Sequence, residues 1–201
     1  MNIAVFASGN GSNFAAIAGA IKKGGIRARL SLLVCDNPAA FVIKRARKAK
    51  VKVALVKRED FPAKADFEKE IIKHLKSNHI DLIVMAGFMR MLGKELLKGY
   101  KNRILNIHPA LLPSFKGASG IKDAFDYGVK VTGVTVHFVD ELMDHGPVIL
   151  QAPVEIEEND TLASLEVKIH QLEHRFYPLA IKLFAEGKLK MQGRRVKVLN
   201  P

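Results

Sequence analysis

The feature that most constrains the fold of this chain is the alternation of short apolar runs with amphipathic stretches in its first half. The apolar runs are typical of buried strands, and they span residues 2–8, 29–36, 52–56, 81–87 and 103–108. The amphipathic stretches are typical of helices, and they span residues 13–24, 38–50, 65–78 and 93–100, with Pro38 in the first turn of the second. Strands and helices that alternate at this spacing predict an α/β fold with a doubly wound, mostly parallel sheet.

The pattern changes in the second half of the chain. Two long strand-like runs at 129–140 and 146–156 are joined by a short polar loop, which predicts an antiparallel C-terminal extension of the sheet. The stretch 161–187 has apolar residues at spacings of three and four and predicts a long helix, which Pro178 should kink. Residues 188–200 have the pattern of a closing hairpin.

The composition is that of a soluble globular protein. Hydrophobic residues make up 48% and charged residues 26% of the chain. No linker or repeat is apparent, and no apolar run approaches the ~18 residues that a membrane span needs, so we expect a single domain over residues 1–201 and no membrane segment. No secretory signal precedes the first strand and Cys35 is the single cysteine, so we expect a cytoplasmic location.

The net charge of +12 is concentrated in two parts of the chain. Residues 22–58 and 187–201 are strongly basic, whereas the middle of the chain has a small excess of acid. A basic nucleic-acid-binding module is one interpretation. However, the segment 44–50 reads as the solvated face of a helix and lacks the interleaved aromatic residues on which bases stack. We therefore expect no nucleic-acid partner, and we expect the charge to attract small anionic substrates.

Polar segments follow three of the predicted strands, at the edge of the sheet where doubly wound proteins bind ligands. They are residues 8–13, 87–90 and 106–109, and the loop 140–146 is a further candidate. The first, SGNGSN, opens a helix whose N-terminal N–H groups can bind a phosphate. It lacks the ending of a Walker A loop, and Phe14 replaces the third glycine of the dinucleotide fingerprint. The segment therefore favours a monophosphate, and a plain tight turn is the alternative.

Asn106 and His108 lie two residues apart in a strand-like segment, so their side chains point to the same face. An amide and an imidazole placed together can both donate to one developing oxyanion. Asp144 is the candidate partner, because a carboxylate beside His108 favours the imidazolium form that suits a general acid. The alternatives are a packed histidine at a strand end and a solvated acid in a turn. His137, on the next predicted strand, reads as a packed or half-exposed residue.

The segment HQLEH at residues 170–174 matches the H-x-x-E-H zinc pattern. The acidic ligand that this pattern needs downstream is missing, because Glu186 lies too far along the same predicted helix to close a site. We therefore expect no metal. His170 and Glu173 are neighbours on one helical face and can contact a substrate amine, and a surface polar pair is the alternative.

Five segments of the chain resemble the phosphoribosylglycinamide formyltransferases of purine biosynthesis. They read FASGNGSNF, AGFMRML, NIHPALLP, VTVHFVDELMDHGPVILQ and HQLEHRFYP, in the same order and at matching spacing over essentially the whole chain. The third and fourth are typical of folate-dependent formyl transfer, and SGNGSN is typical of the glycinamide ribonucleotide branch. The resemblance implies that the predicted sheet is formyltransferase-like.

The resemblance also implies an enzyme that transfers a formyl group from the co-substrate 10-formyltetrahydrofolate to the amine of glycinamide ribonucleotide, without a metal or a covalent intermediate. Asn106 and protonated His108 would stabilise the tetrahedral oxyanion. Asp144 would keep His108 protonated and help to move protons through water. The implied partners are these two small molecules, with no nucleic acid and no membrane, and we expect a monomer or a homodimer.

Further contacts follow from the resemblance. The substrate-binding positions are the phosphate contacts Gly11, Ser12 and Asn13 and the glycinamide-end contacts His170, Gln171, Leu172 and Glu173. The folate-binding positions are Lys64, Met89, Arg90, Met91, Leu92 and Asn106. Lys64 replaces an arginine of some family members and loses its bidentate fork. Ser119 replaces a histidine of some members near the reaction centre, and no role is assigned to it.

Two related enzymes are alternatives. Methionyl-tRNA formyltransferase has a similar core and a C-terminal tRNA-binding domain, for which a chain ending at Pro201 has no room. Formyltetrahydrofolate deformylase uses similar motifs with water as the acceptor, and it has an additional N-terminal domain, whereas the first strand here begins at Asn2. We expect neither of these activities.

Overall fold

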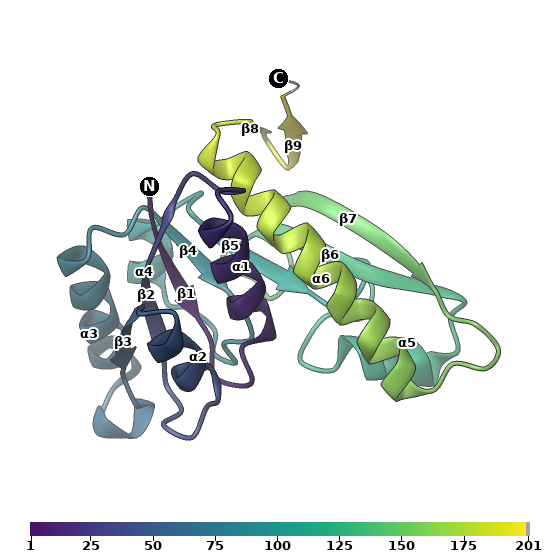
Figure 1. Cartoon of the computed structure of the whole chain (residues 1–201), viewed down its shortest axis with the longest axis horizontal. Coiled ribbons are helices and arrows are strands. Elements are labelled where there is room, and N and C mark those ends of the chain that lie inside the picture. The colour runs from purple at the N-terminus through teal and green to yellow at the C-terminus, as the bar shows by residue number, and fades with distance from the viewer. Residues whose placement is uncertain (200–201) are drawn as a thin grey trace. The chain divides into compact units, whose positions relative to one another are not determined.

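The computed structural model describes residues 1–199 (Figure 1). The strands are β1 Asn2–Phe6, β2 Arg29–Cys35, β3 Lys52–Leu55, β4 Leu82–Met85, β5 Ile104–His108, β6 Val131–Phe138, β7 Val148–Glu155, β8 Leu189–Gln192 and β9 Arg195–Val198. The α-helices are α1 Ser12–Lys22, α2 Val42–Lys48, α3 Lys64–Ser77, α4 Lys94–Gly99, α5 Gly120–Tyr127 and α6 Leu162–Ala185, with a 3-10 helix at Arg58–Asp60. A seven-stranded sheet has the order β3-β2-β1-β4-β5-β6-β7, and β8 pairs with β9 in a second sheet. The chain consists of two compact units, Met1–Leu105 and Asn106–Pro201.

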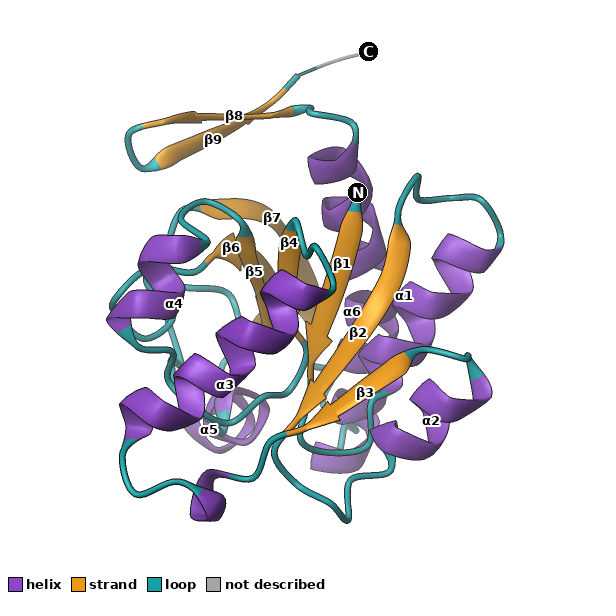
Figure 2. Ribbon diagram, turned by 90° about the vertical axis from the view of Figure 1, so that its left-hand side faces the viewer, coloured by secondary structure: helices purple, strands orange, loops and turns teal. Residues whose placement is uncertain are grey.

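The first unit is doubly wound. Strand β1 pairs in parallel with β2 and with β4, and β2 pairs in parallel with β3. Helices α1 and α2 cover one face of these strands, and α3 and α4 cover the other (Figure 2). Because both faces are buried, β1 and β4 are continuous apolar runs, in which residues 3–6 and 82–84 are 0% exposed. The predicted parallel part of the sheet is confirmed.

Helix α2 begins later than the sequence predicts. Pro38 and Ala39 form a turn. The Asn37 side-chain oxygen accepts a hydrogen bond from the Ala39 N–H at 3.0 Å, and the Asn37 carbonyl accepts one from the Ala40 N–H at 3.1 Å. These bonds compete with helical ones, so the helix begins only at Val42. The prediction that Pro38 lies in the first turn of this helix is wrong.

The second unit contains the antiparallel part of the sheet. Strands β6 and β7 pair antiparallel, with Val134 opposite Ala152. Helix α6 packs along both strands, where Leu165 and Ile169 form a buried apolar cluster with Val134 and Ala152. The predicted antiparallel extension and the predicted C-terminal hairpin are confirmed.

Helix α6 begins with a capping box. The Thr161 hydroxyl accepts a hydrogen bond from the Ser164 N–H at 3.2 Å, and the Ser164 hydroxyl accepts one from the Thr161 N–H at 2.9 Å. Two N–H groups at the helix start are thereby satisfied. The helix continues past Pro178 to Ala185, and the kink at Pro178 stays a prediction. None of the helices within residues 1–199 has the length and apolar composition that crossing a membrane requires.

Helix α5 is absent from the sequence-based prediction. Its fully buried residues, Gly120 and Ala124, are small, and its apolar period of Ile121, Ala124 and Phe125 spans little more than one turn. The helix packs against α6. Gly128 ends it in the left-handed conformation at φ 80°, which is a further local signal of a helix end. Because its local pattern is short, this helix is identified by its packing against α6.

The start of α1 depends on Gly11, whose φ of 76° lies in the left-handed region. A Cβ on Gly11 would lie 2.4 Å from Cγ2 and 3.1 Å from Cα of Val42, so a side chain would press α1 against α2. We expect Gly11→Ala to lower the free energy of unfolding by about 2 kcal/mol or more, from backbone strain of ~1 kcal/mol plus the clash. Urea denaturation would measure this loss.

Gly9→Ala is the matched control in the same loop, because a Cβ on Gly9 meets no atom within 4 Å. We expect this variant to change the free energy of unfolding by less than about 0.5 kcal/mol. Equal losses in the two variants would contradict the role given to Gly11.

Candidate active site

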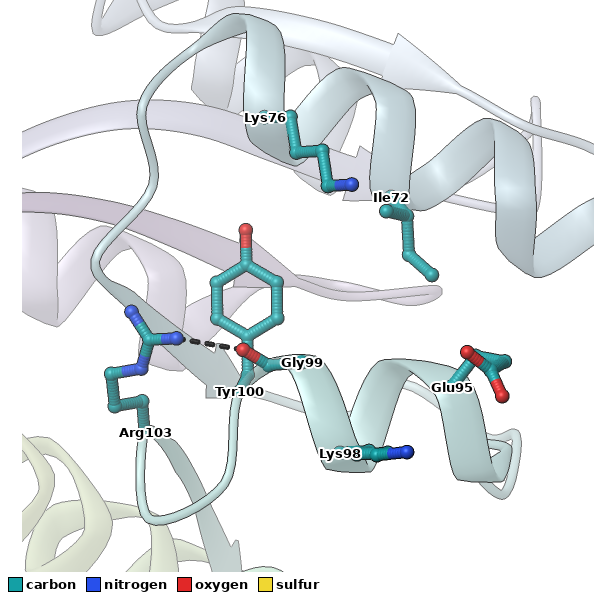
Figure 3. A pocket seen from close by; sticks show the side chains of 7 residues that line it. All are labelled: Ile72, Lys76, Glu95, Lys98, Gly99, Tyr100 and Arg103. Carbon is teal, nitrogen blue, oxygen red and sulfur yellow. Dashed lines mark hydrogen bonds between the residues drawn. The ribbon is translucent and has the colours of Figure 1, made fainter.

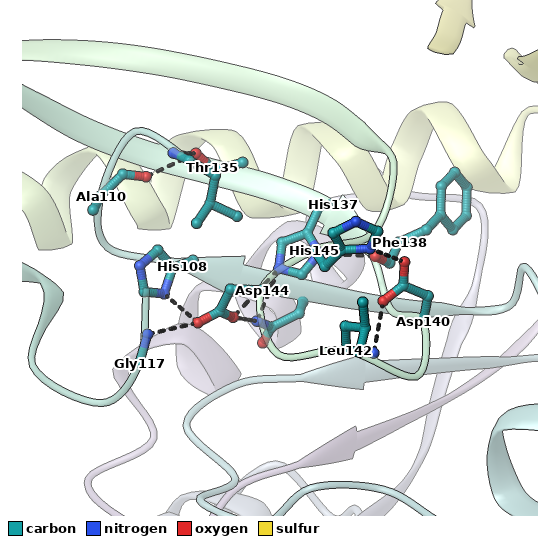
Figure 4. Close-up of polar contacts among 12 residues, drawn as sticks. His108, Ala110, Gly117, Thr135, His137, Phe138, Asp140, Leu142, Asp144 and His145 are labelled. Atoms are coloured by element: carbon teal, nitrogen blue, oxygen red, sulfur yellow. Dashed lines mark hydrogen bonds and ion pairs between the residues drawn. The ribbon is translucent and has the colours of Figure 1, made fainter. Parts of the chain in front are cut away.

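The carboxylate of Asp144 lies at the centre of the polar cluster in Figure 4. His108 is the last residue of β5, and its Nδ1 lies 3.4 Å from Asp144 Oδ2. The Gly117 N–H donates to the same oxygen at 2.9 Å. The other oxygen, Oδ1, accepts a long hydrogen bond of 3.5 Å from Asn106 Nδ2. The structure thus brings together Asn106, His108 and Asp144, the three residues that the sequence singles out as catalytic candidates.

The His108 ring is 3% exposed and has an acceptor at each nitrogen. Its Nε2 lies 2.7 Å from the Phe115 carbonyl oxygen, and its Nδ1 faces the Asp144 carboxylate. A carbonyl only accepts hydrogen bonds, so Nε2 carries the proton of that bond, and a second proton on Nδ1 would pair the ring with the carboxylate charge. The surroundings of His108 therefore suit an imidazolium, which can donate to a developing negative charge.

His137, on β6, has complementary surroundings that sequence reasoning missed. Its Nδ1 donates to the Phe138 carbonyl at 2.8 Å, and its Nε2 accepts from Asn106 Nδ2 at 3.1 Å. Both bonds fit the neutral ring, and burial lowers the pKa of His137 below its usual value of 6.5. Neutral His137 thereby orients the Asn106 amide. The signal available in the sequence was an ionisable residue within the strand-like run 132–138, and the structure shows that this run is buried throughout.

The backbone of Asp144 has a φ of 46°, in the left-handed region that few residues other than glycine adopt. The loop that carries it is closed by a hydrogen bond from the Phe138 N–H to the Pro147 carbonyl at 2.9 Å. Gly146 packs so closely inside it that a Cβ would lie 1.8 Å from the Phe138 carbonyl oxygen. A strained residue that presents a polar side chain is typical of a functional site.

In the first unit, Gly11 is the N-cap of α1, and Ser12 and Asn13 open the helix. Gly11 has no side chain to accept a hydrogen bond from the first-turn N–H groups, and that turn contains no acidic residue. The partial positive charge of the helix N-terminus is therefore not offset by side chains of its own cap or first turn. The arrangement suits an anion such as a phosphate.

Residues 89–92, predicted as folate contacts, lie in the loop before α4. Met89 and Met91 are 67% and 45% exposed, so two flexible apolar side chains are open to a ligand. The Arg90 guanidinium instead forms an ion pair with Asp36, which also accepts a hydrogen bond from the Ser8 hydroxyl at 2.5 Å. The two methionines thus offer an open apolar surface in this loop, whereas the Arg90 guanidinium is paired with Asp36.

Lys64, the remaining folate candidate of the first unit, has a half-exposed side chain whose Nζ lies 3.8 Å from Glu68 Oε1. Glu68 is buried and accepts a hydrogen bond from the Gly93 N–H at 2.6 Å. This carboxylate therefore ties α3 to Gly93, which directly follows the half-buried Leu92 and precedes α4. Lys64 lies on the solvent side of Glu68 in this ion pair.

His170 and Glu173 form a pair on α6, in which His170 Nδ1 lies 3.0 Å from Glu173 Oε2. Hydrogen bonding to the Glu173 carboxylate raises the pKa of His170 above its usual value. Glu173 is buried, Gln171 is exposed, and Leu172 packs against the apolar cluster of β6, β7 and α6. Within residues 1–199, no group of three or more His, Cys, Asp or Glu side chains could hold a metal ion.

The loop of Asp144 also exposes two large apolar side chains, Leu142 and Met143, at 62% and 51%. Sequence reasoning did not single them out, although two apolar residues between acids in a polar loop are an available signal. Their exposure leaves an apolar surface beside the catalytic candidates of the second unit.

A separate pocket of about 490 Å³ lies between α3 and α4 (Figure 3). It is lined by Ile72, Lys76, Glu95, Lys98, Gly99, Tyr100 and Arg103. Lys76 and Lys98 stand in the last turns of the two helices, where cations complement the helix dipole. Arg103 donates to the Gly99 carbonyl at 2.7 Å. The charges around this pocket are therefore explained by the helix ends, and none of the predicted site residues lines it.

Comparison with known proteins defines the class to which this site belongs. Residues 1–181 match the family described as formyl transferase. The chain therefore belongs to the formyl transferase family.

Within that family, the chain is similar to phosphoribosylglycinamide formyltransferases. The enzyme of that name from Bacillus subtilis (strain 168) is 49% identical over 179 residues, which are 89% of this chain and 92% of the relative. Glycinamide ribonucleotide transformylase 1 from Symbiobacterium toebii has a crystal structure with a TM-score of 0.97 at 42% identity, covering 100% of this chain and 94% of that one. The corresponding structure from Geobacillus kaustophilus has a TM-score of 0.90 at 49% identity, covering 92% and 98%. The predicted resemblance and the formyltransferase-like fold are confirmed.

Burial of neutral His137 links stability to pH. The pKa of His137 is lower in the folded protein than in the unfolded chain, where it is about 6.5. The unfolded chain therefore binds the proton first as the pH falls, so the stability that depends on this residue is present above about pH 6.5 and is lost below it. We expect His137→Gln to flatten the decline of the unfolding free energy between about pH 7 and pH 5, measured by urea denaturation.

His79→Gln is the control, because His79 is exposed to solvent. We expect its pH dependence to match that of the wild type. A decline in His137→Gln as steep as in the wild type would show that His137 does not cause it.

Proposed function

We infer that this chain transfers the formyl group of 10-formyltetrahydrofolate to the amine of glycinamide ribonucleotide, as a phosphoribosylglycinamide formyltransferase of purine biosynthesis. The products are formylglycinamide ribonucleotide and tetrahydrofolate. The observation that carries the inference is the meeting of Asn106, His108 and Asp144 at the end of β5, in a chain 49% identical to the Bacillus subtilis relative.

Asn106 and His108 stabilise the oxyanion. Attack of the substrate amine on the formyl carbon moves negative charge onto the formyl oxygen, and two N–H donors at that oxygen lower the barrier. His108 Nε2 is the ring donor that does not face Asp144, so the formyl oxygen replaces the Phe115 carbonyl as its acceptor. The Asn106 N–H that contacts Asp144 at 3.5 Å makes a weak hydrogen bond, so giving it up costs little.

Asp144 keeps the His108 ring oriented and charged through the contact between Oδ2 and Nδ1. The attacking amine must also lose a proton, and the departing folate nitrogen must gain one. The Asp144 side chain is 11% exposed, so water can carry protons between the carboxylate and the reacting groups. These steps consist of positioning and electrostatic stabilisation, and they require no metal and no covalent intermediate.

Glycinamide ribonucleotide is bound at its two ends. Gly11, Ser12 and Asn13 hold the phosphate through the N–H groups at the start of α1. The Glu173 carboxylate, together with the helix segment of His170, Gln171 and Leu172, engages the glycinamide end. The lack of a side-chain cap at the start of α1 and the burial of Glu173 support these assignments, since a buried carboxylate favours a cationic or N–H-bearing partner.

10-Formyltetrahydrofolate is held by the side chains of Met89 and Met91, which supply apolar walls for its ring. Arg90 and Leu92 contribute through the backbone of the same loop, and Lys64 attracts the folate carboxylates as a point charge. Asn106 contacts the formyl group. The exposure of the two methionines is the observation that fits this ligand.

We propose further that residues 1–201 form one catalytic domain, that it acts in the cytoplasm as a monomer or homodimer, and that it binds no nucleic acid. Support comes from the continuous match over residues 1–181 and from the lack of interleaved aromatic residues in the basic segment 44–50. Ser119 is exposed and receives no role.

Substitution of the three catalytic candidates should depress turnover. Loss of one oxyanion donor typically costs ~10²–10³ in kcat, and we expect falls of this order in Asn106→Ala, His108→Ala and Asp144→Asn. Asp144→Asn is the sharpest variant, because it keeps the shape of the side chain and removes the charge that faces His108. Steady-state kinetics would measure the loss, and thermal unfolding would verify the fold.

Glu141→Gln is the matched control, because it removes an exposed carboxylate from the same loop. We expect it to retain wild-type kcat. Near-normal turnover in Asp144→Asn would remove Asp144 from the mechanism.

The formyl acceptor is tested by following the absorbance of 10-formyltetrahydrofolate with glycinamide ribonucleotide present and then omitted. We expect turnover only when this acceptor is present. Turnover without it would show that water is the acceptor, and the reaction would then be hydrolysis. No turnover in either case would overturn the proposed function.

A further inference from the structure

The C-terminal hairpin follows the part of the chain that matches the formyl transferase family, residues 1–181. Its strands β8 and β9 have four residues each, and a two-stranded hairpin has little stability of its own in water. The half-buried side chains of Leu189, Met191, Val196 and Val198 alternate with exposed ones, and β9 packs against β7. The hairpin is therefore docked through one apolar face.

Arg194, in the turn of this hairpin, reaches the loop that carries Asp144. Its Nη2 donates to the His145 carbonyl oxygen, and its Nη1 lies 3.1 Å from His145 Nε2. One guanidinium thus contacts the backbone and the ring of a residue 49 positions away in the sequence. The planar fork of an arginine suits two such acceptors, whereas a lysine ammonium acts as a point charge.

The His145 ring continues this contact into the loop. Its Nδ1 lies 2.7 Å from Asp140 Oδ2 and donates to it (Figure 4), so Nε2 of the neutral ring is an acceptor for Arg194. The other oxygen of Asp140 accepts a hydrogen bond from the Leu142 N–H at 3.0 Å. Arg194, His145 and Asp140 therefore form a continuous series of hydrogen bonds across the loop.

Asp144 directly precedes His145 and has the left-handed φ of 46° that the loop must maintain. We propose that Arg194 is a positioning residue for formyl transfer: by fixing the carbonyl and the ring of His145, it holds the Asp144 carboxylate in place beside His108. This inference rests on the proposed function. Gly117 also holds Asp144, through its N–H at 2.9 Å, so loss of Arg194 weakens the arrangement without abolishing it.

Arg194→Ala is the test variant, and Arg195→Ala is its matched control. Arg195 is the neighbouring exposed cation, and its side chain makes no hydrogen bond or ion pair within residues 1–199. Because small displacements of reacting groups cost up to ~10² in rate, we expect Arg194→Ala to lower kcat about tenfold while KM for either substrate changes by less than about twofold. Arg195→Ala should match the wild type, and Arg194→Lys should recover only part of the loss.

Nitrogen NMR of the histidine side chains reports on the site without turnover. We expect the His108 ring signals to shift in Arg194→Ala and to stay unchanged in Arg195→Ala. Thermal midpoints of both variants should remain within about 2 °C of the wild type, because these contacts are exposed. A merely structural role of Arg194 would change the thermal midpoint and leave the His108 signals unchanged.

A double-mutant cycle tests whether Arg194 acts through His145. Once His145→Ala has removed the ring, Arg194→Ala should lower kcat by a smaller factor than it does in the wild type. Wild-type kcat in Arg194→Ala, an equal fall in Arg195→Ala, or unchanged His108 signals would each overturn the positioning role. The proposed function fails separately, if the wild-type enzyme does not turn over glycinamide ribonucleotide, and the NMR comparison then still tests the contact itself.

Discussion

The carboxylate of Asp144 is the group on which the arrangement of the catalytic candidates depends. Its two oxygens face His108 Nδ1 at 3.4 Å, the Gly117 N–H at 2.9 Å and Asn106 Nδ2 at 3.5 Å. These donors come from the end of β5 and from the loop that precedes α5, while Asp144 comes from the loop after β6. A nearly buried negative charge is costly without such donors. The Asp144 charge therefore links the end of β5, the loop before α5 and the loop after β6, and the donors of the first two segments stabilise the charge in return.

The two buried histidines of this cluster show how the surroundings assign different roles to one residue type. His108 has a carbonyl and a carboxylate at its nitrogens and suits the charged ring. His137 has a carbonyl and an amide N–H and suits the neutral ring. Environments that separate the protonation states of neighbouring groups are typical of acid–base and electrostatic catalysis. Here they suit the His108 ring to donating and leave the His137 ring as a support for the Asn106 amide.

An element could be predicted from the sequence when neighbouring residues carried its pattern, and it was missed when the pattern was short or depended on distant residues. Strands β1 and β4 were predicted because burial on both faces requires a continuous apolar run. Helix α5 was missed because its apolar period, made by Ile121, Ala124 and Phe125, spans little more than one turn. The start of α2 was misplaced because one Asn37 side chain redirects the turn that follows it. The contact of His137 with Asn106 was missed because Asn106 lies on another strand, and the contact depends on how the sheet is assembled.

By itself, the sequence determined the alternation of strands and helices in the first half of the chain, the shared face of Asn106 and His108, and the helix that the segment 8–13 opens, because side-chain alternation and helix termini follow from neighbouring residues. Only the tertiary structure decided that Asp144 reaches Asn106 across 38 positions, that His137 is buried in its neutral form, and that Arg194 reaches His145 across 49. Those contacts depend on the left-handed backbone at Asp144 and on the docking of a distant hairpin. No local pattern encodes them, because each is made by segments that meet only after the chain has folded.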